Sequence, residues 1–181
     1  MSGNREIDVI SLLKGIEKQA NDNAYGHPQQ VKVKDEWNGI AFRTGEHRVV
    51  TPLHEVVEIH SCPELSMVPR TKSWVSGIAN IRGTLLPVID LGKYLRDKPV
   101  RSSRQSRVMV IRHAGLLAGV IVDEVLGLTQ FEEEEYTKEI SMEDDSVKPF
   151  IKYGFRRGNE YWPVFSLHRL AESQHFQQAA V

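Results

Sequence analysis

The sequence predicts a mainly β protein made of two similar β lobes, and two observations lead to this prediction. Short runs of β-branched and aromatic residues follow one another closely, with glycine-containing turns between them, which is typical of a small barrel or sandwich. Two motifs from the first half of the chain also recur, in the same order, in the second half. We therefore place one lobe at about 37–95 and the other at about 105–170.

The first 36 residues are predicted to form a helix followed by a linker. Across residues 6–19, apolar side chains recur at intervals of three, which is the pattern of an amphipathic helix; they are Ile7, Ile10, Leu13 and Ile16. Residues 20–36 are polar and contain Gly and Pro, as linkers do. The helix is therefore expected to be an appendage of a separate domain at 37–176.

From Trp37 onward, short predicted strands alternate with turns. The predicted strands are 37–43, 48–59, 78–81, 84–91, 107–113, 116–128, 153–155 and 161–165. A basic polar loop is expected at 97–107, an acidic segment at 132–145, and a short C-terminal helix at 166–176.

The internal repeat consists of two matched pairs of segments. Leu53–Ile59 and Val122–Leu128 share the pattern apolar, polar, Glu, Val, apolar, any, apolar. Arg82–Leu91 and Arg157–Leu167 share an Arg-Gly turn followed by a Pro-Val strand, with one extra residue in the second turn. The alternative explanation is that strand-turn-strand units resemble one another for general physical reasons. If the repeat is real, the groove between two lobes and their edge strands offer binding places for a partner.

Composition excludes several classes of protein. Lys and Arg number 23 against 24 Asp and Glu, so the overall basic excess typical of nucleic-acid binders is missing, and we expect no nucleic-acid partner. A single cysteine, Cys62, allows neither an internal disulfide nor a multi-cysteine zinc site. Neither a signal peptide nor an apolar run of the roughly 18–20 residues that span a bilayer is present. We therefore expect a cytoplasmic protein without direct membrane insertion.

Motifs for catalysis are missing as well. The sequence contains no phosphate-binding loop, dinucleotide fingerprint or nucleophile elbow. His54 and His60 share strand parity but lack a third metal ligand, and Cys62 has no evident base. Asp90 ends an apolar strand without the acidic pair that would hold Mg²⁺, and His168 is better explained as part of a surface helix. We therefore expect no enzymatic activity, no metal and no cofactor.

Two charged runs remain after this search. Residues 93–112 carry seven basic side chains against one acidic, and 132–145 carry eight acidic against one lysine. Such runs are usually solvated loops, although they can also neutralise each other or steer a partner. The basic run leaves open an alternative function, a generic β-barrel interaction module that binds another protein or nucleic acid through 93–112.

Residues Trp74–Leu91 resemble the signature of the CheW-like domain family. That signature is a Gly-apolar-x-Asn-apolar-Arg-Gly turn followed by a strand ending Pro-Val-Ile-Asp-Leu. Val56–Ile59 fits the family's Val-x-Glu-apolar segment, and Gly119–Val125 fits its Gly-apolar-apolar-Val-Asp-x-Val segment. The resemblance covers about 37–170, most of the chain.

The resemblance implies a fold and a role. The fold is two five-stranded SH3-like β-barrels packed together. The role is that of a non-enzymatic adaptor that couples the cytoplasmic tip of a methyl-accepting chemoreceptor to the regulatory domain of a CheA-type histidine kinase. The N-terminal extension, Trp37–Ile40 and Trp162–Ser166 are more similar to the family members of type IV pilus (twitching motility) systems than to the flagellar adaptor. The residues that contact the kinase stay unknown at this stage.

The resemblance also implies a receptor-binding site around one turn. Arg82 corresponds to the family's receptor-coupling arginine, Glu58 and Val56 match positions near it, and Asn80 and Gly83 belong to the same turn motif. Arginine is an unusual choice for a tight turn, where Asn or Asp serves better. We expect Glu58 and Arg82 to pair across the surface of the lobe.

Overall fold

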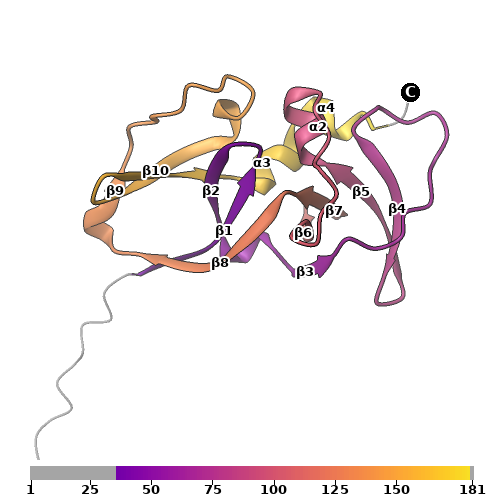
Figure 1. The fold of residues 1–181 in the computed structure, drawn as a ribbon, viewed down its shortest axis with the longest axis horizontal. Coiled ribbons are helices and arrows are strands. Elements are labelled where there is room, and N and C mark those ends of the chain that lie inside the picture. Colours follow the sequence, from indigo (N-terminus) through magenta and orange to yellow (C-terminus); the bar gives the residue numbers. More distant parts are fainter. Residues whose placement is uncertain (1–35, 180–181) are drawn as a thin grey trace, which may run out of the picture. The chain divides into compact units, whose positions relative to one another are not determined.

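In the computed structural model, which describes residues 36–179, the chain forms two β-sheets with short helices beside them (Figure 1). The predicted mainly β fold is confirmed, and the two five-stranded barrels that the resemblance implied correspond to one sheet of six strands and one of five. The helix predicted at 6–19 lies outside the described residues.

The first sheet has six strands in the order β8-β1-β2-β11-β10-β9. Its strands are β1 (Trp37–Thr44), β2 (His47–Pro52), β8 (Glu124–Phe131), β9 (Tyr136–Thr137), β10 (Ile151–Arg157) and β11 (Glu160–Phe165). The second sheet has five strands in the order β3-β6-β7-β5-β4. Its strands are β3 (Glu58–Ser61), β4 (Val75–Ile81), β5 (Thr84–Asp90), β6 (Arg107–His113) and β7 (Leu116–Val122).

These sheets do not coincide with the predicted lobes 37–95 and 105–170, so that assignment is wrong. The six-stranded sheet combines β1 and β2 with β8 to β11, and the five-stranded sheet combines β3, β4 and β5 with β6 and β7. The chain changes sheet at two places that were expected to be continuous strand. The short 3-10 helix η1 (Leu53–Glu55) interrupts the run 48–59, and Asp123 separates β7 from β8 within 116–128.

The repeat itself is present in the topology. The order β8-β1-β2-β11-β10 in one sheet has the same connectivity as β3-β6-β7-β5-β4 in the other. Each order contains one parallel pair at the same place, with Val164 beside Val50 and Val88 beside Gly119. The matched segments Leu53–Ile59 and Val122–Leu128 are the two crossings between the sheets. Each half of the chain therefore contributes its first hairpin to the other half's sheet.

The core is continuous across the two sheets. Its largest cluster includes Phe42 and Val49 from the first sheet and Met109 and Ile111 from the second, all fully buried. Burial of one such side chain contributes about 1.5–3 kcal/mol. Residues 36–179 therefore hold the two crossings and the elements beside them in one packed unit.

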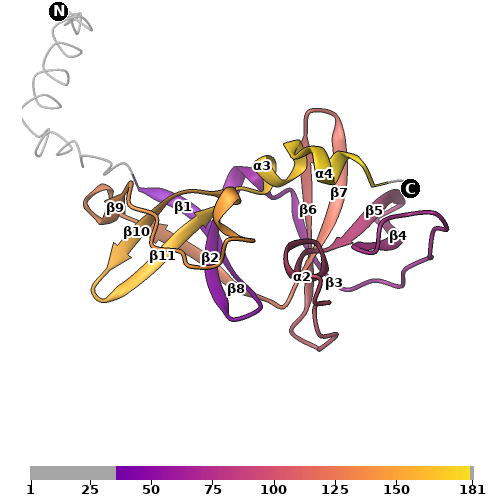
Figure 2. The same ribbon diagram turned by 90° about the horizontal axis from the view of Figure 1, so that it is seen from above.

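The helices are short, and two of them, α2 and α3, begin at equivalent positions of the repeat. They are α2 (Leu91–Arg96), η2 (Glu133–Glu135), η3 (Lys148–Phe150), α3 (Leu167–Glu172) and α4 (Gln174–Gln177). Asp90 caps α2 by accepting a hydrogen bond from Lys93 N at 2.8 Å, and Ser166 caps α3 by accepting one from Arg169 N at 3.1 Å. The single helix expected at 166–176 is two helices, because Ser173 is extended and caps α4. Figure 2 shows α3 at the junction between the sheets.

Candidate partner-binding site

The turn between β4 and β5 presents Arg82 to solvent. Arg82 and Gly83 have φ angles of 50° and 84°, the positive values that a tight type I′ hairpin turn requires at both central residues. Glycine and Asn adopt this conformation at low cost, whereas an arginine rarely occupies it. The Arg82 side chain is 75% exposed. Local hairpin stability therefore does not explain why arginine stands at this position.

Arg82 contacts Glu58, as the sequence predicted. Its Nη1 lies 3.3 Å from Glu58 Oε2, and His60 Nε2 lies 2.7 Å from the same oxygen. Glu58 and His60 are on β3, at one edge of the five-stranded sheet, while Arg82 follows β4, at the other edge. An exposed ion pair of this kind stabilises a fold by only about 0–1 kcal/mol. Its main effect is to hold the Glu58 and Arg82 side chains in one orientation at the surface.

The other residues predicted for this site differ in exposure. Asn80 on β4 and Gly83 in the turn are exposed beside Arg82. Val56 is only partly exposed and packs against the main core cluster. The Val56 side chain therefore anchors the crossing segment to the core and is not available to a partner.

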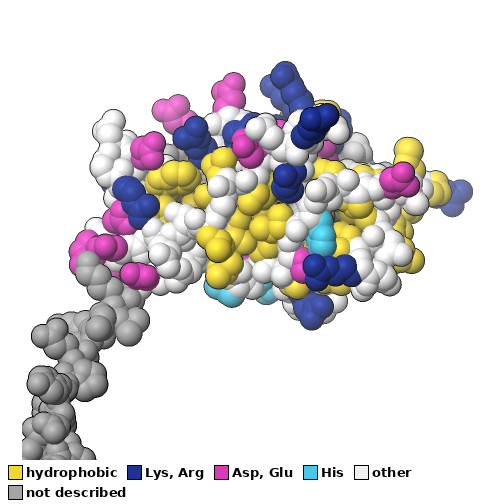
Figure 3. Space-filling view, turned by 60° about the horizontal axis from the view of Figure 1, so that its bottom comes forward, with side chains coloured by type: hydrophobic (Ala, Val, Ile, Leu, Met, Phe, Trp, Pro, Cys, Tyr) yellow, Lys and Arg dark blue, Asp and Glu magenta, His cyan; other side chains and the backbone are white. Residues whose placement is uncertain are grey.

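Sequence reasoning missed a set of exposed apolar side chains, two of which, Val57 and Ile59, flank Glu58 along the chain. Large apolar side chains are exposed on the first crossing, on β3 and on β8; we call Leu53, Val57, Ile59, Leu126 and Leu128 the edge-strand patch. Figure 3 shows hydrophobic side chains gathered on the face where β8 and β3 lie. Contiguous exposed apolar surface is typical of protein-binding sites.

The repeat contained the signal for this patch. Val57 aligns with Leu126 and Ile59 aligns with Leu128, and all four are more than a third exposed. Ile59 is on β3 and Val57 lies just before it, whereas Leu126 and Leu128 are on β8. The strands β3 and β8 are the equivalent edge strands of the two sheets. Apolar residues at equivalent edge positions indicate a surface that is covered by a partner rather than by the chain's own core.

The residues that were weighed as catalytic differ in their surroundings. Cys62 lies at the surface, where displacement of water by neighbouring protein atoms raises the pKa of its thiol and keeps it protonated. Asp90 caps α2 and accepts a second backbone hydrogen bond from Val100 N, and burial raises the pKa of its carboxyl group. His60 is bound to Glu58. Neither the thiol nor the carboxyl group is arranged as an activated catalytic group.

The two charged runs meet other parts of the fold. In the acidic run, Glu135 and Glu139 pair with Arg157 and Arg156 of β10, at 2.6 and 3.1 Å.

A polar pocket of about 550 Å³ lies between the first hairpin and the basic loop, and its lining mixes both signs of charge. These charged residues are Arg43, Glu46, Arg96, Lys98, Arg101, Asp123 and Asp144. Because both signs are present, the pocket does not single out an anion or a cation.

Comparison with known proteins shows which family this geometry belongs to. The sequence matches the CheW-like domain over residues 38–175. It is also 38% identical to Protein PilI of Pseudomonas aeruginosa over 172 residues, which are 95% of this chain and 96% of that protein. This chain belongs to the CheW-like domain family.

Other members and one solved structure agree with this assignment. Protein FrzA of Myxococcus xanthus is 34% identical over 97 residues, covering 54% of this chain and 61% of FrzA. The crystal structure of scaffolding protein TtCheW from Thermoanaerobacter tengcongensis superposes with a TM-score of 0.65 and 24% identity, covering 77% of this chain and 94% of that one. The similarity in structure shows that this chain has the CheW-like fold.

In this CheW-like domain, the signature stretch forms one hairpin. Trp74 is buried ahead of β4, the Asn-x-Arg-Gly motif forms the end of β4 and the exposed turn, and Pro-Val-Ile-Asp forms the end of β5. The buried half of the signature thus builds the core, and the turn carries the exposed groups. Within the part of the chain that the structure describes, no helix is long and apolar enough to cross a bilayer.

Proposed function

We propose that this protein is a non-enzymatic adaptor that couples a methyl-accepting chemoreceptor to a CheA-type histidine kinase in a chemosensory array. The observation that carries the proposal is the exposed Arg82, held by Glu58 in a left-handed turn beside the edge-strand patch. The similarity to PilI over nearly the whole chain supports a role in the control of type IV pili and twitching motility. The protein acts in the cytoplasm, where receptor tips and kinase meet.

The receptor contact combines an apolar anchor with a charged group of defined orientation. The edge-strand patch supplies apolar area that a helical receptor tip can cover. Arg82 and Glu58 stand at its border and select a partner with complementary charges. Asn80 and Gly83 complete the exposed turn, and Val56 supports the crossing from the core side. Binding energy from these groups is sufficient for an adaptor, which needs no cofactor.

The kinase contact must use a separate surface, because an adaptor has to hold both partners at once. Individual contacts of small area are transient, and many of them in one array give high avidity. The receptor's signalling state reaches the kinase through the adaptor only if the two states bind it with different affinity.

A binding titration tests this proposal. The regulatory domain of the co-encoded CheA-type kinase, and separately the receptor's cytoplasmic tip, are titrated into the wild-type protein, Arg82→Ala and the control Arg112→Ala. Arg112 is exposed on β6 and belongs neither to the turn nor to the edge-strand patch. We expect wild type and Arg112→Ala to bind both partners, and Arg82→Ala to lose about tenfold in receptor affinity alone.

A double-mutant cycle with Glu58→Ala then measures the coupling between Glu58 and Arg82 in receptor binding. Additive effects would contradict a joint role of the pair. A folded wild-type protein that binds neither partner would overturn the proposed function. Binding of DNA or RNA that weakens steeply with salt would instead favour the interaction module that uses 93–112.

A further inference from the structure

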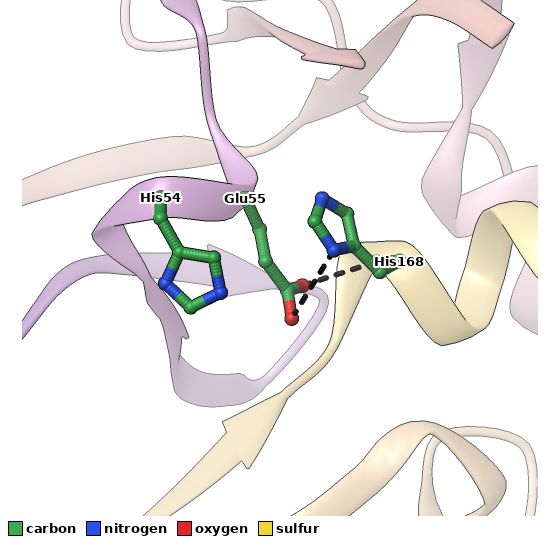
Figure 4. A group of neighbouring side chains, drawn as sticks. All are labelled: His54, Glu55 and His168. Atoms are coloured by element: carbon green, nitrogen blue, oxygen red, sulfur yellow. Dashed lines mark hydrogen bonds and ion pairs between the residues drawn. The ribbon is translucent and has the colours of Figure 1, made fainter. Parts of the chain in front are cut away.

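A second cluster of polar side chains lies at the junction of the two sheets, away from the Arg82 turn. His54 and Glu55 belong to η1, at the first crossing, and His168 belongs to α3 (Figure 4). One potential ligand atom from each of the three residues lies within 4.8 Å of the other two. His54 is exposed, Glu55 is 1% exposed and His168 is partly buried. The cluster therefore opens to solvent on the His54 side.

The carboxylate of Glu55 is the buried centre of this cluster. It accepts hydrogen bonds from Ser166 Oγ at 3.0 Å and from His168 N at 3.0 Å. The cationic partner nearest to it is Lys152, whose Nζ lies 3.4 Å from Oε1 and whose side chain is 37% exposed. A buried carboxylate favours a cation beside it. A lysine on a flexible, half-exposed stem can leave this position when a stronger cation arrives.

The His168 ring is held in place without hydrogen bonds from its own nitrogens to the cluster. Its Nδ1 lies 4.0 Å from Glu55 Oε1, beyond hydrogen-bond distance, and its Nε2 is buried without a hydrogen-bond partner. His113 stacks on the ring with the centroids 4.2 Å apart, and Glu172 in turn binds His113 Nε2 at 2.6 Å. In Figure 4, one ring nitrogen of His168 faces the Glu55 carboxylate, and the His54 ring lies on the other side of that carboxylate.

We propose that His54, Glu55 and His168 bind a zinc ion, with water in the fourth position. Two imidazole nitrogens and one carboxylate oxygen are a ligand set that suits zinc rather than Mg²⁺ or Ca²⁺. Zinc takes nitrogen and oxygen ligands at about 2.0–2.2 Å, so the ligand atoms must draw closer than they now lie. The exposed His54 ring can rotate to close this gap, whereas Glu55 and His168 are already oriented by Ser166 and His113.

Zinc at this position would join the crossing between the sheets to α3. A ligand that binds only the folded chain stabilises it in proportion to the logarithm of its concentration over Kd. Zinc is therefore expected to raise the melting temperature as well as to bind. This inference does not depend on the adaptor function, because the cluster shares no residue with the Arg82 turn.

The experiment uses the full chain, freed of metal with a chelator, and measures zinc by competition with a chromophoric indicator and by the shift in melting temperature. Mg²⁺ serves as the control ion, His54→Ala as the principal variant and His60→Ala as the matched control on β3. We expect one equivalent of zinc bound with micromolar Kd, a loss of more than about tenfold in His54→Ala, and no change in His60→Ala. Lys152→Ala should bind zinc more tightly, because the competing ammonium is gone.

Each opposite result overturns the site. Wild-type protein that takes up no zinc at micromolar concentration excludes it. Zinc binding that His54→Ala leaves unchanged, or that His60→Ala weakens equally, places the metal elsewhere on the chain. His54 is exposed, so its replacement leaves the fold intact, and the result does not hinge on the partly buried His168.

Discussion

At the scale of single residues, Arg82 occupies a turn conformation that does not favour an arginine. Its φ of 50° is a conformation that costs an ordinary L-residue roughly 1 kcal/mol. Its exposed ion pair with Glu58 stabilises the fold by no more than about 1 kcal/mol. Backbone strain that is not compensated locally is concentrated at functional positions. This cost supports the receptor contact that we propose for Arg82.

We expect Arg82→Asn to leave the free energy of unfolding unchanged or to raise it by up to about 1 kcal/mol, because Asn tolerates a positive φ. Receptor binding should weaken in the same variant. Urea unfolding and the receptor titration measure the two effects. Ala114 provides the control, since it has a φ of 48° and precedes a glycine in another two-residue turn, between β6 and β7. Ala114→Asn should gain stability without losing receptor affinity, whereas a large loss of stability in Arg82→Asn would contradict a mainly functional role.

At the scale of elements, the repeat places a helix cap after each of two equivalent strands. Asp90 ends β5 and caps α2, and Ser166 follows β11 and caps α3. The two caps differ in what else they bind. Asp90 holds the loop through Val100 N, whereas the Ser166 hydroxyl also donates to the buried Glu55. The same position thus stabilises a helix in both sheets but completes a buried polar network in only one.

Asp90→Ser places at the start of α2 the capping residue that α3 has, so we expect this variant to fold normally. We expect Asp90→Ala to lose about 1 kcal/mol of the free energy of unfolding. Ser166→Ala should cost more, about 2–3 kcal/mol, because it also leaves the buried Glu55 carboxylate short of a donor. Urea unfolding of the three variants tests the order. Equal losses in Asp90→Ala and Ser166→Ala would show that the contact with Glu55 contributes nothing.

Asp90 also predicts a dependence of stability on pH. Burial raises the pKa of its carboxyl group above the ordinary 3.8, so the folded protein holds this proton more tightly than the unfolded chain does. The contribution of Asp90 to the free energy of unfolding is therefore largest below the ordinary pKa, and it declines as pH rises through the raised pKa. We compare the free energy of unfolding of wild type with that of Asp90→Ser from pH 3.5 to 7. As pH rises, the value for wild type should fall relative to the value for Asp90→Ser. A constant difference would show that the pKa is not raised.

At the scale of the whole molecule, the exchange of hairpins makes the two halves dependent on each other. The hairpin of β1 and β2 pairs with β8 and β11 of the second half, and the hairpin of β6 and β7 pairs with β3 and β5 of the first. The main core cluster also draws on both sheets. Neither half contains a complete sheet, so the domain is one cooperative unit despite its repeat.

We expect a fragment of residues 36–104 and a fragment of 105–179 each to stay unfolded alone, and their mixture to recover β structure and a cooperative melting transition. Circular dichroism of the separate and mixed fragments measures this. A fragment that melts cooperatively by itself would instead support lobes that follow the sequence order, as the repeat first suggested.

Local patterns in the sequence were sufficient for most of the strands and turns and for the family, although β9 and the two breaks at η1 and Asp123 were missed. The signature hairpin, the strand 107–113 and the contact of Arg82 with Glu58 are found as predicted. The repeat was also recognisable, since its matched segments lie at equivalent places in the two sheets. Such features depend on neighbouring residues along the chain, where alternation, glycine turns and motif spacing are directly visible.

The sequence by itself thus determined a mainly β CheW-like domain with a repeated strand order and an exposed arginine turn. Only the tertiary structure decided which half supplies each hairpin, which apolar side chains stay exposed on β3 and β8, and that Glu55 lies beside His168, 113 residues away. The physical reason is that partner choice between strands, and contacts across a core, depend on packing between distant segments. A crossing residue such as Asp123 looks like part of a continuous strand until the sheets on either side of it are in place.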